Sequence, residues 1–127
     1  MAEDKEGQAI MELFDRVQLH RENASKFAQQ DRSAAVMRQR TQLTLSELAA
    51  VPEETRVYKS IGKAYFHSPM ATVVGALEGR VASCDSDLLS IRQQRDAVEK
   101  KLRESDKELQ ELIRASAPDT LQRMTGA

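Results

Sequence analysis

The most regular feature of the chain is a seven-residue repeat of apolar positions in its second half. Steps of four and three alternate, with two polar interruptions, along Met70, Val74, Leu77, Val81, Cys84, Leu88, Ile91, Arg95, Val98, Leu102, Ser105, Leu109 and Leu112. A heptad repeat sustained over this length is typical of a coiled coil. Ser68 is a favourable N-cap, Pro69 suits the first helical position and Pro118 disfavours further helix, so we predict a helix over residues 69–116.

A weaker repeat of the same kind runs through the first half of the chain. Four of its positions are polar in the series Ile10, Leu13, Val17, His20, Ala24, Phe27, Asp31, Ala34, Arg38, Thr41, Leu45 and Leu48. We predict a helix over about residues 5–50, because Pro52 disfavours a helical residue before it. Thr44 with Glu47 also resembles a capping box, which leaves open a break near Thr44. Neither helix can bury its apolar seam alone, so the two are expected to pack antiparallel.

The segment between the two predicted helices has a different composition. Val57 to His67 is rich in β-branched and aromatic residues, and Gly62 lies centrally, where a tight turn would need glycine. We therefore predict a β-hairpin over residues 56–67, and a mainly α fold in which one hairpin joins a long antiparallel two-helix coiled coil. An isolated hairpin is marginally stable and leaves both edges unpaired, so it needs strands from other chains. The residues expected to mediate this assembly are Val57, Tyr58, Ile61, Gly62, Tyr65 and Phe66.

Composition narrows the possible functions. The 127 residues are expected to form one domain, 1–127, with 117–127 as a flexible tail. A formal net charge of −1, with both signs interspersed, argues against a nucleic-acid groove or a polybasic membrane anchor. No stretch approaches the length of an apolar membrane span. The single cysteine, Cys84, excludes an internal disulfide and fits a reducing compartment, so we expect the cytoplasm.

Candidate catalytic chemistry is missing from the sequence. No His, Cys, Asp and Glu cluster has metal-ligand spacing, and no nucleophile has a base at a suitable spacing. The pair Gly62-Lys63 lacks every other element of a phosphate-binding loop. We therefore expect a protein that is not an enzyme and that uses neither a metal nor a cofactor.

The order helix, hairpin, helix resembles the beta-type subunits of prefoldin. Residues 57–62, Val-Tyr-Lys-Ser-Ile-Gly, are close to that family's hairpin pattern of an aromatic, a polar pair, an aliphatic and a glycine. The flanking residues most resemble the eukaryotic subunit-one type, through Leu43-Thr44, Glu47-Leu48, Glu53-Glu54-Thr55, Tyr58, Gly62-Lys63 and Phe66. The architectural resemblance covers roughly residues 8–116, whereas the specific motif spans only about residues 43–66. Pro52 departs from the pattern expected of that subunit type.

The resemblance implies a function that the residues alone do not show. Prefoldin is a hexamer of two alpha-type and four beta-type subunits, with a β-barrel body from which coiled coils project. It is an ATP-independent holdase that binds unfolded client proteins at the coiled-coil tips and delivers them to the cytosolic group II chaperonin. This chain has room for one hairpin, as beta-type subunits have.

The same resemblance places client binding at the start of the first helix and the end of the second. Met11, Phe14 and Ile113 lie there beside the seam, without a seam partner of their own, as expected of an adaptable apolar surface. The predicted client-binding residues are Ile10, Met11, Leu13, Phe14, Val17, Leu109, Leu112 and Ile113. For these residues the alternatives are a thicker structural seam and self-association of the chain. For the function of the chain the alternatives are a coiled-coil adaptor or tether, an enzyme-associated regulatory subunit, and a prefoldin-like subunit of another complex without client-holding activity.

Overall fold

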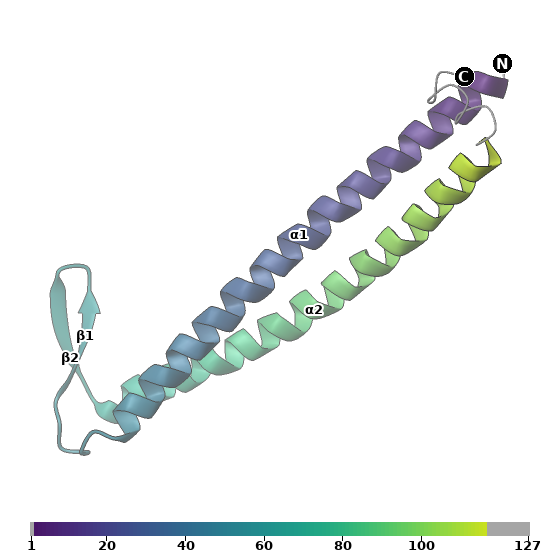
Figure 1. The fold of residues 1–127 in the computed structure, drawn as a ribbon. Helices are drawn as coiled ribbons and strands as arrows, with labels where there is room; N and C mark the ends of the chain where they lie inside the picture. The colour runs from purple at the N-terminus through teal and green to yellow at the C-terminus, as the bar shows by residue number, and fades with distance from the viewer. Residues whose placement is uncertain (1, 117–127) are drawn as a thin grey trace. The chain divides into compact units, whose positions relative to one another are not determined.

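The computed structural model describes residues 2–116, and the side-chain surroundings of residues 5–116. The elements in chain order are helix α1 (Ala2–Ala49), strand β1 (Val57–Ile61), strand β2 (Ala64–Ser68) and helix α2 (Met70–Ala115) (Figure 1). Two long helices with one antiparallel hairpin between them confirm the predicted fold class. The tail predicted over residues 117–127 lies outside the described residues.

The two heptad seams are the faces that the helices bury. Every position of the first series is buried or half-buried, and so is every position of the second except Leu112, which is 37% exposed. The residues that flank these positions are mostly exposed and polar. This pattern confirms the predicted register and shows that the helices are stabilised by packing along a narrow stripe.

The helix ends differ in detail from the prediction. Helix α1 continues through Thr44, whose hydroxyl donates to the Arg40 carbonyl at 3.0 Å, so no break occurs there. Helix α2 begins one residue later than predicted, because the Pro69 carbonyl accepts its first bond, from the Val73 amide, at 3.1 Å. Pro69 thus occupies the N-cap position. Ser68 is not the N-cap, because it pairs with Val57 as the last residue of β2.

The described chain forms two compact units, and each is considered by itself. The terminal unit contains the residues up to Ala28 and those from Arg92 onward, and the hairpin unit contains residues 29–91. In the terminal unit the first part of α1 packs against the last part of α2. Its core consists of Leu13, Val17 and Leu109, which are 6%, 1% and 8% exposed, with Ile10 and Leu102 packed against them.

The hairpin unit combines a small apolar core with polar seam positions. Cys84 and Leu88 are buried, and Thr41 is buried with its hydroxyl donating to the Met37 carbonyl at 2.8 Å. Arg38, a seam residue of α1, forms an ion pair with Asp85 of α2 and also donates to the side chain of Gln42 at 3.2 Å. A half-exposed ion pair of this kind contributes little stability, on the order of 0.2–1 kcal/mol. It does favour one alignment of α1 against α2, as polar seam residues do in coiled coils.

The hairpin has a two-residue turn that depends on glycine. Ile61 pairs with Ala64 across the turn, and Gly62 has a φ of 62°, whereas Lys63 does not adopt a positive φ. These dihedrals match a type II′ turn, whose first central residue is normally glycine and whose twist suits a tight hairpin. The predicted need for a glycine at position 62 is therefore confirmed.

Candidate assembly and client surfaces

One face of the hairpin carries both tyrosines of the chain. The register pairs Tyr58 with His67 and Ser60 with Tyr65, so these four side chains lie on the same face of the sheet. Tyr58 and His67 make an edge-to-face contact with ring centroids 5.7 Å apart. Even so, Tyr58 and Tyr65 remain 53% and 74% exposed. The face is therefore an aromatic surface that residues 5–116 leave uncovered.

The opposite face of the hairpin is also apolar. Val57, Ile61 and Phe66 share it with Lys59, and Ile61 and Phe66 are 56% and 52% exposed, while Val57 is half-buried. The sheet of the described chain consists of β1 and β2, so the outer edge of each strand has no backbone partner. A hairpin with apolar side chains on both faces and two open edges is marginally stable by itself and is suited to packing against further strands or a helix.

A second exposed apolar surface lies in the terminal unit. Met11, Phe14 and Ile113 are 63%, 47% and 43% exposed. Phe14 follows the seam residue Ile10 by four positions, and Ile113 follows Leu109 by four. In an antiparallel pair, a two-fold axis perpendicular to the plane of the two helix axes relates one helix to the other. Side chains at equivalent heptad positions of the two helices therefore lie on the same side of that plane. Phe14 and Ile113 therefore flank the seam on one side, and Met11 adjoins Phe14 one turn away. We call these three residues the tip surface.

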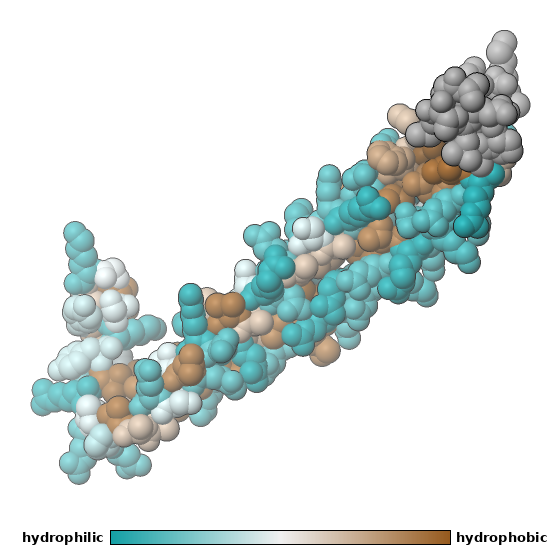
Figure 2. Space-filling model, viewed as in Figure 1, coloured by the Kyte–Doolittle hydropathy of each residue, from teal (hydrophilic) through white to brown (hydrophobic). Residues whose placement is uncertain are grey.

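The eight predicted client-binding residues separate into two groups. Leu13, Val17 and Leu109 form the core of the terminal unit, with Ile10 packed against them, so the chain's own helices already cover these four side chains. The exposed members are the tip surface and Leu112. Leu112 also lines a small hollow of about 70 Å³ with Glu6, Ile10, Ala115 and Ser116. Figure 2 shows apolar surface in the terminal unit, bordered by hydrophilic residues. Exposure therefore narrows the candidate client surface to the three residues of the tip surface, which lie beside the seam, and to Leu112 at its end.

A comparison with known protein families identifies the family to which this chain belongs. The family described as "Prefoldin subunit" matches residues 11–116, which include the hairpin and most of both helices. The chain belongs to this family. Prefoldin is a non-enzymatic chaperone family whose subunits form complexes with one another.

Individual relatives agree with this assignment. The chain is 34% identical over 76 residues to "Prefoldin subunit 1" of Arabidopsis thaliana, a match that covers 60% of this chain and 59% of that protein. It is 27% identical over 114 residues to "Probable prefoldin subunit 1" of Dictyostelium discoideum, covering 82% and 98% of the two chains. The predicted resemblance to the prefoldin subunit-one type is confirmed.

A solved structure supports the fold independently of sequence similarity. The prefoldin beta subunit of Thermococcus strain KS-1 superposes with a TM-score of 0.76 at 17% identity, covering 84% of this chain and 93% of that chain. At this identity the match bears on the fold alone. It shows that the helix, hairpin and helix arrangement is that of a beta-type prefoldin subunit, as the single hairpin of this chain predicts.

Three further features of the described residues concern Cys84, metal binding and membrane spans. Cys84 is buried on the seam of α2, as expected of a small apolar residue. The described residues contain no group of three or more His, Cys, Asp and Glu side chains that could hold a metal ion. No helix within residues 2–116 is long and apolar enough to cross a membrane.

Some surface features were not predicted from the sequence. Val36, Met37 and Leu43 are large apolar residues of α1 that are 46%, 46% and 58% exposed. These three residues lie outside the heptad seam, so the seam pattern did not indicate them. Their spacing was a usable signal, because residues 36 and 43 are one heptad apart and fall on a face away from the seam.

Proposed function

We propose that this chain is a subunit of a cytoplasmic prefoldin hexamer, formed by two alpha-type and four beta-type subunits. The hairpin joins the strands of neighbouring subunits, and the tip surface holds unfolded client proteins for transfer to the group II chaperonin. Membership of the prefoldin family supports assembly with other subunits. The exposed aromatic and aliphatic residues on both faces of the hairpin support assembly through the hairpin.

The observation that carries client binding is the tip surface. Its three side chains are large, apolar and exposed, although buried seam positions lie directly beside them. Burial of apolar area contributes about 25 cal/mol per Å², so a few such side chains together give weak and reversible capture of varied sequences. Methionine adapts to differently shaped partners, which suits a site without a fixed ligand. This mode of binding requires no nucleotide, so ATP is expected to leave it unchanged.

The tip surface can be tested by replacing its residues in the assembled complex. Met11→Ser, Phe14→Ser and Ile113→Ser, combined, should reduce the suppression of aggregation of denatured actin, because apolar contact area is lost. The loss should be partial, since other subunits have tips of their own. Light scattering during dilution of the denatured client measures the effect.

A matched control removes exposed apolar residues elsewhere. Leu19 and Leu89 are 54% and 63% exposed and lie outside the tip surface, so Leu19→Ser with Leu89→Ser should leave protection unchanged. Circular dichroism and complex size should stay as in the wild type for both variants. Full protection by the triple variant would remove these residues from client binding. A loss of helicity would instead assign them to the structural seam and favour an adaptor or tether.

A further inference from the structure

Helix α1 carries an uncommon distribution of charge in the hairpin unit. From Arg32 to Ser46 the sequence contains three arginines and no aspartate or glutamate, although the whole chain has 20 acidic and 19 basic residues. Arg38 is engaged with Asp85 at the seam. Arg32 and Arg40 are exposed, and within residues 5–116 neither guanidinium has a carboxylate partner. Two positive charges are therefore available on the outward side of α1.

Apolar side chains lie between and beside these two arginines. Arg32, Val36 and Arg40 follow one another at four-residue intervals, so they form a single ridge along the helix. Met37 and Leu43 adjoin this ridge, and Arg32, Ser33, Val36, Met37 and Arg40 line a shallow hollow of about 320 Å³. We call Arg32, Val36, Met37, Arg40 and Leu43 the outer α1 surface.

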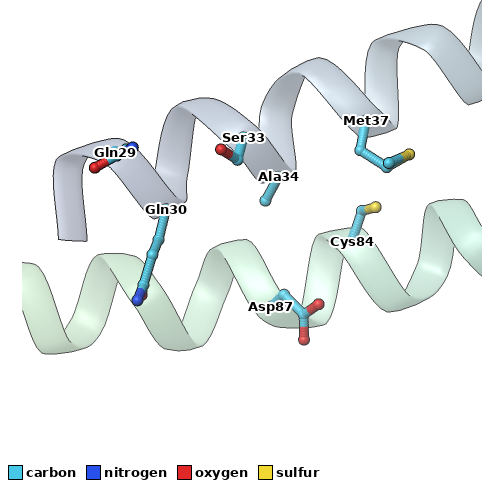
Figure 3. A pocket seen from close by; sticks show the side chains of 7 residues that line it. All are labelled: Gln29, Gln30, Ser33, Ala34, Met37, Cys84 and Asp87. Carbon is cyan, nitrogen blue, oxygen red and sulfur yellow. The ribbon is translucent and has the colours of Figure 1, made fainter. Parts of the chain in front are cut away.

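The hollow continues toward α2 along Met37. A neighbouring depression of about 420 Å³ is lined by Gln29, Gln30, Ser33, Ala34, Met37, Cys84 and Asp87, and Figure 3 shows Met37 of α1 and Cys84 of α2 facing each other across it. Ser33 and Met37 line both depressions. The second depression is lined mainly by polar residues, with Asp87 among them, so the apolar part of the hollow is the stretch at Val36 and Met37, with Arg32 and Arg40 on either side of it.

We propose that the outer α1 surface binds an acidic segment of a partner protein. The segment would place one or two apolar side chains over Val36 and Met37 and a carboxylate beside each arginine. Arg32 and Arg40 are eight residues apart, which corresponds to about 12 Å along the helix axis. A partner helix with carboxylates two turns apart, flanking an apolar residue, matches both the charge and the spacing. The proposal does not depend on client binding at the tip surface.

Other occupants fit the outer α1 surface less well. A second copy docked through the same surface would bring Arg32 and Arg40 of both chains together, and like charges at an interface oppose binding. Nucleic-acid sites are usually part of a broad basic patch, whereas this chain has a formal net charge of −1. A polypeptide with both acidic and apolar side chains can pair with Arg32 and Arg40 and cover Val36 and Met37 at the same time.

Synthetic peptides test the proposal directly. The probe is a fluorescent, helix-forming peptide with two leucines flanked by glutamates, measured by anisotropy against the chain assembled with its partner prefoldin subunits. Arg32→Glu with Arg40→Glu should weaken binding at least about tenfold at low salt, because attraction becomes repulsion. Val36→Ser with Met37→Ser should also weaken it, and glutamine in place of the peptide glutamates should weaken binding to the wild type.

The matched control reverses two other exposed arginines of α1. Arg16→Glu with Arg21→Glu makes the same change in net charge inside the terminal unit, and it should alter the affinity by less than about twofold. Equal losses for the two charge reversals would mean non-specific attraction and overturn the proposal. Binding to the free chain but not to the assembled complex would also overturn it, because a neighbouring subunit would then cover the surface. Equal binding of the glutamate and glutamine peptides would contradict the role of the arginines.

Discussion

Gly62→Val and Ile61→Asp, each made alone, are expected to abolish assembly with partner prefoldin subunits while both helices remain folded. Gly62 has a φ of 62°, a region that a β-branched residue adopts only at a cost of about 1–3 kcal/mol. An added Cβ would meet nothing within 4 Å, so the effect is conformational and not a clash. Ile61 is 56% exposed in the chain, so we expect the isolated chain to tolerate an aspartate there. The proposed pairing with other strands would bury that carboxylate among apolar side chains, which is unfavourable.

Size-exclusion chromatography with light scattering, after mixing with the partner subunits, measures this effect. Lys63→Ala is the matched control, because it alters the same turn at a position without a positive φ. It should assemble like the wild type. Circular dichroism should report unchanged helicity for all three variants. Normal assembly of both Gly62→Val and Ile61→Asp would show that pairing through the hairpin is not how the subunits join.

Leu88→Ala is expected to destabilise the chain by about 2–4 kcal/mol, which is the cost of losing a buried leucine and leaving a cavity. Leu88 is 7% exposed on the seam of α2, whereas its neighbour Leu89 is 63% exposed. Leu89→Ala makes the same chemical change one residue later and should cost less than about 0.5 kcal/mol. Urea unfolding followed by circular dichroism compares the two variants. Equal losses, or a greater loss for Leu89→Ala, would mean that the assigned seam is shifted by one residue.

Much of the fold could be predicted from the sequence because its main signals are periodic or local. A heptad repeat determines which face of a helix is buried, whatever the partner, so the positions around Val17 and Leu88 were placed correctly. Gly62 could be assigned to a tight turn because few other residues tolerate its dihedral angle. The predicted start of α2 was one residue too early, because Ser68 pairs with Val57 in the hairpin and therefore does not cap the helix.

The surfaces were harder to predict, because they depend on what packing leaves uncovered. The heptad repeat already placed Met11, Phe14 and Ile113 beside the seam and Leu13, Val17 and Leu109 on it. It did not indicate that Leu112, which is also a seam position, is 37% exposed, because that depends on how the helix ends pack. The Arg38–Asp85 pair joins residues 47 positions apart, which no local pattern reveals. The outer α1 surface combines exposure with an absence of acidic residues, and its exposure becomes evident only once the seam is assigned.

One measurement tests the division of the chain into an assembly element and a client surface. A photo-crosslinking amino acid replaces Phe14 in one variant and Tyr65 in another, both in the assembled complex incubated with denatured actin. Mass spectrometry of the products should find the client attached at position 14 and a neighbouring prefoldin subunit attached at position 65. Client attachment at position 65, or attachment only of neighbouring subunits at position 14, would contradict the account.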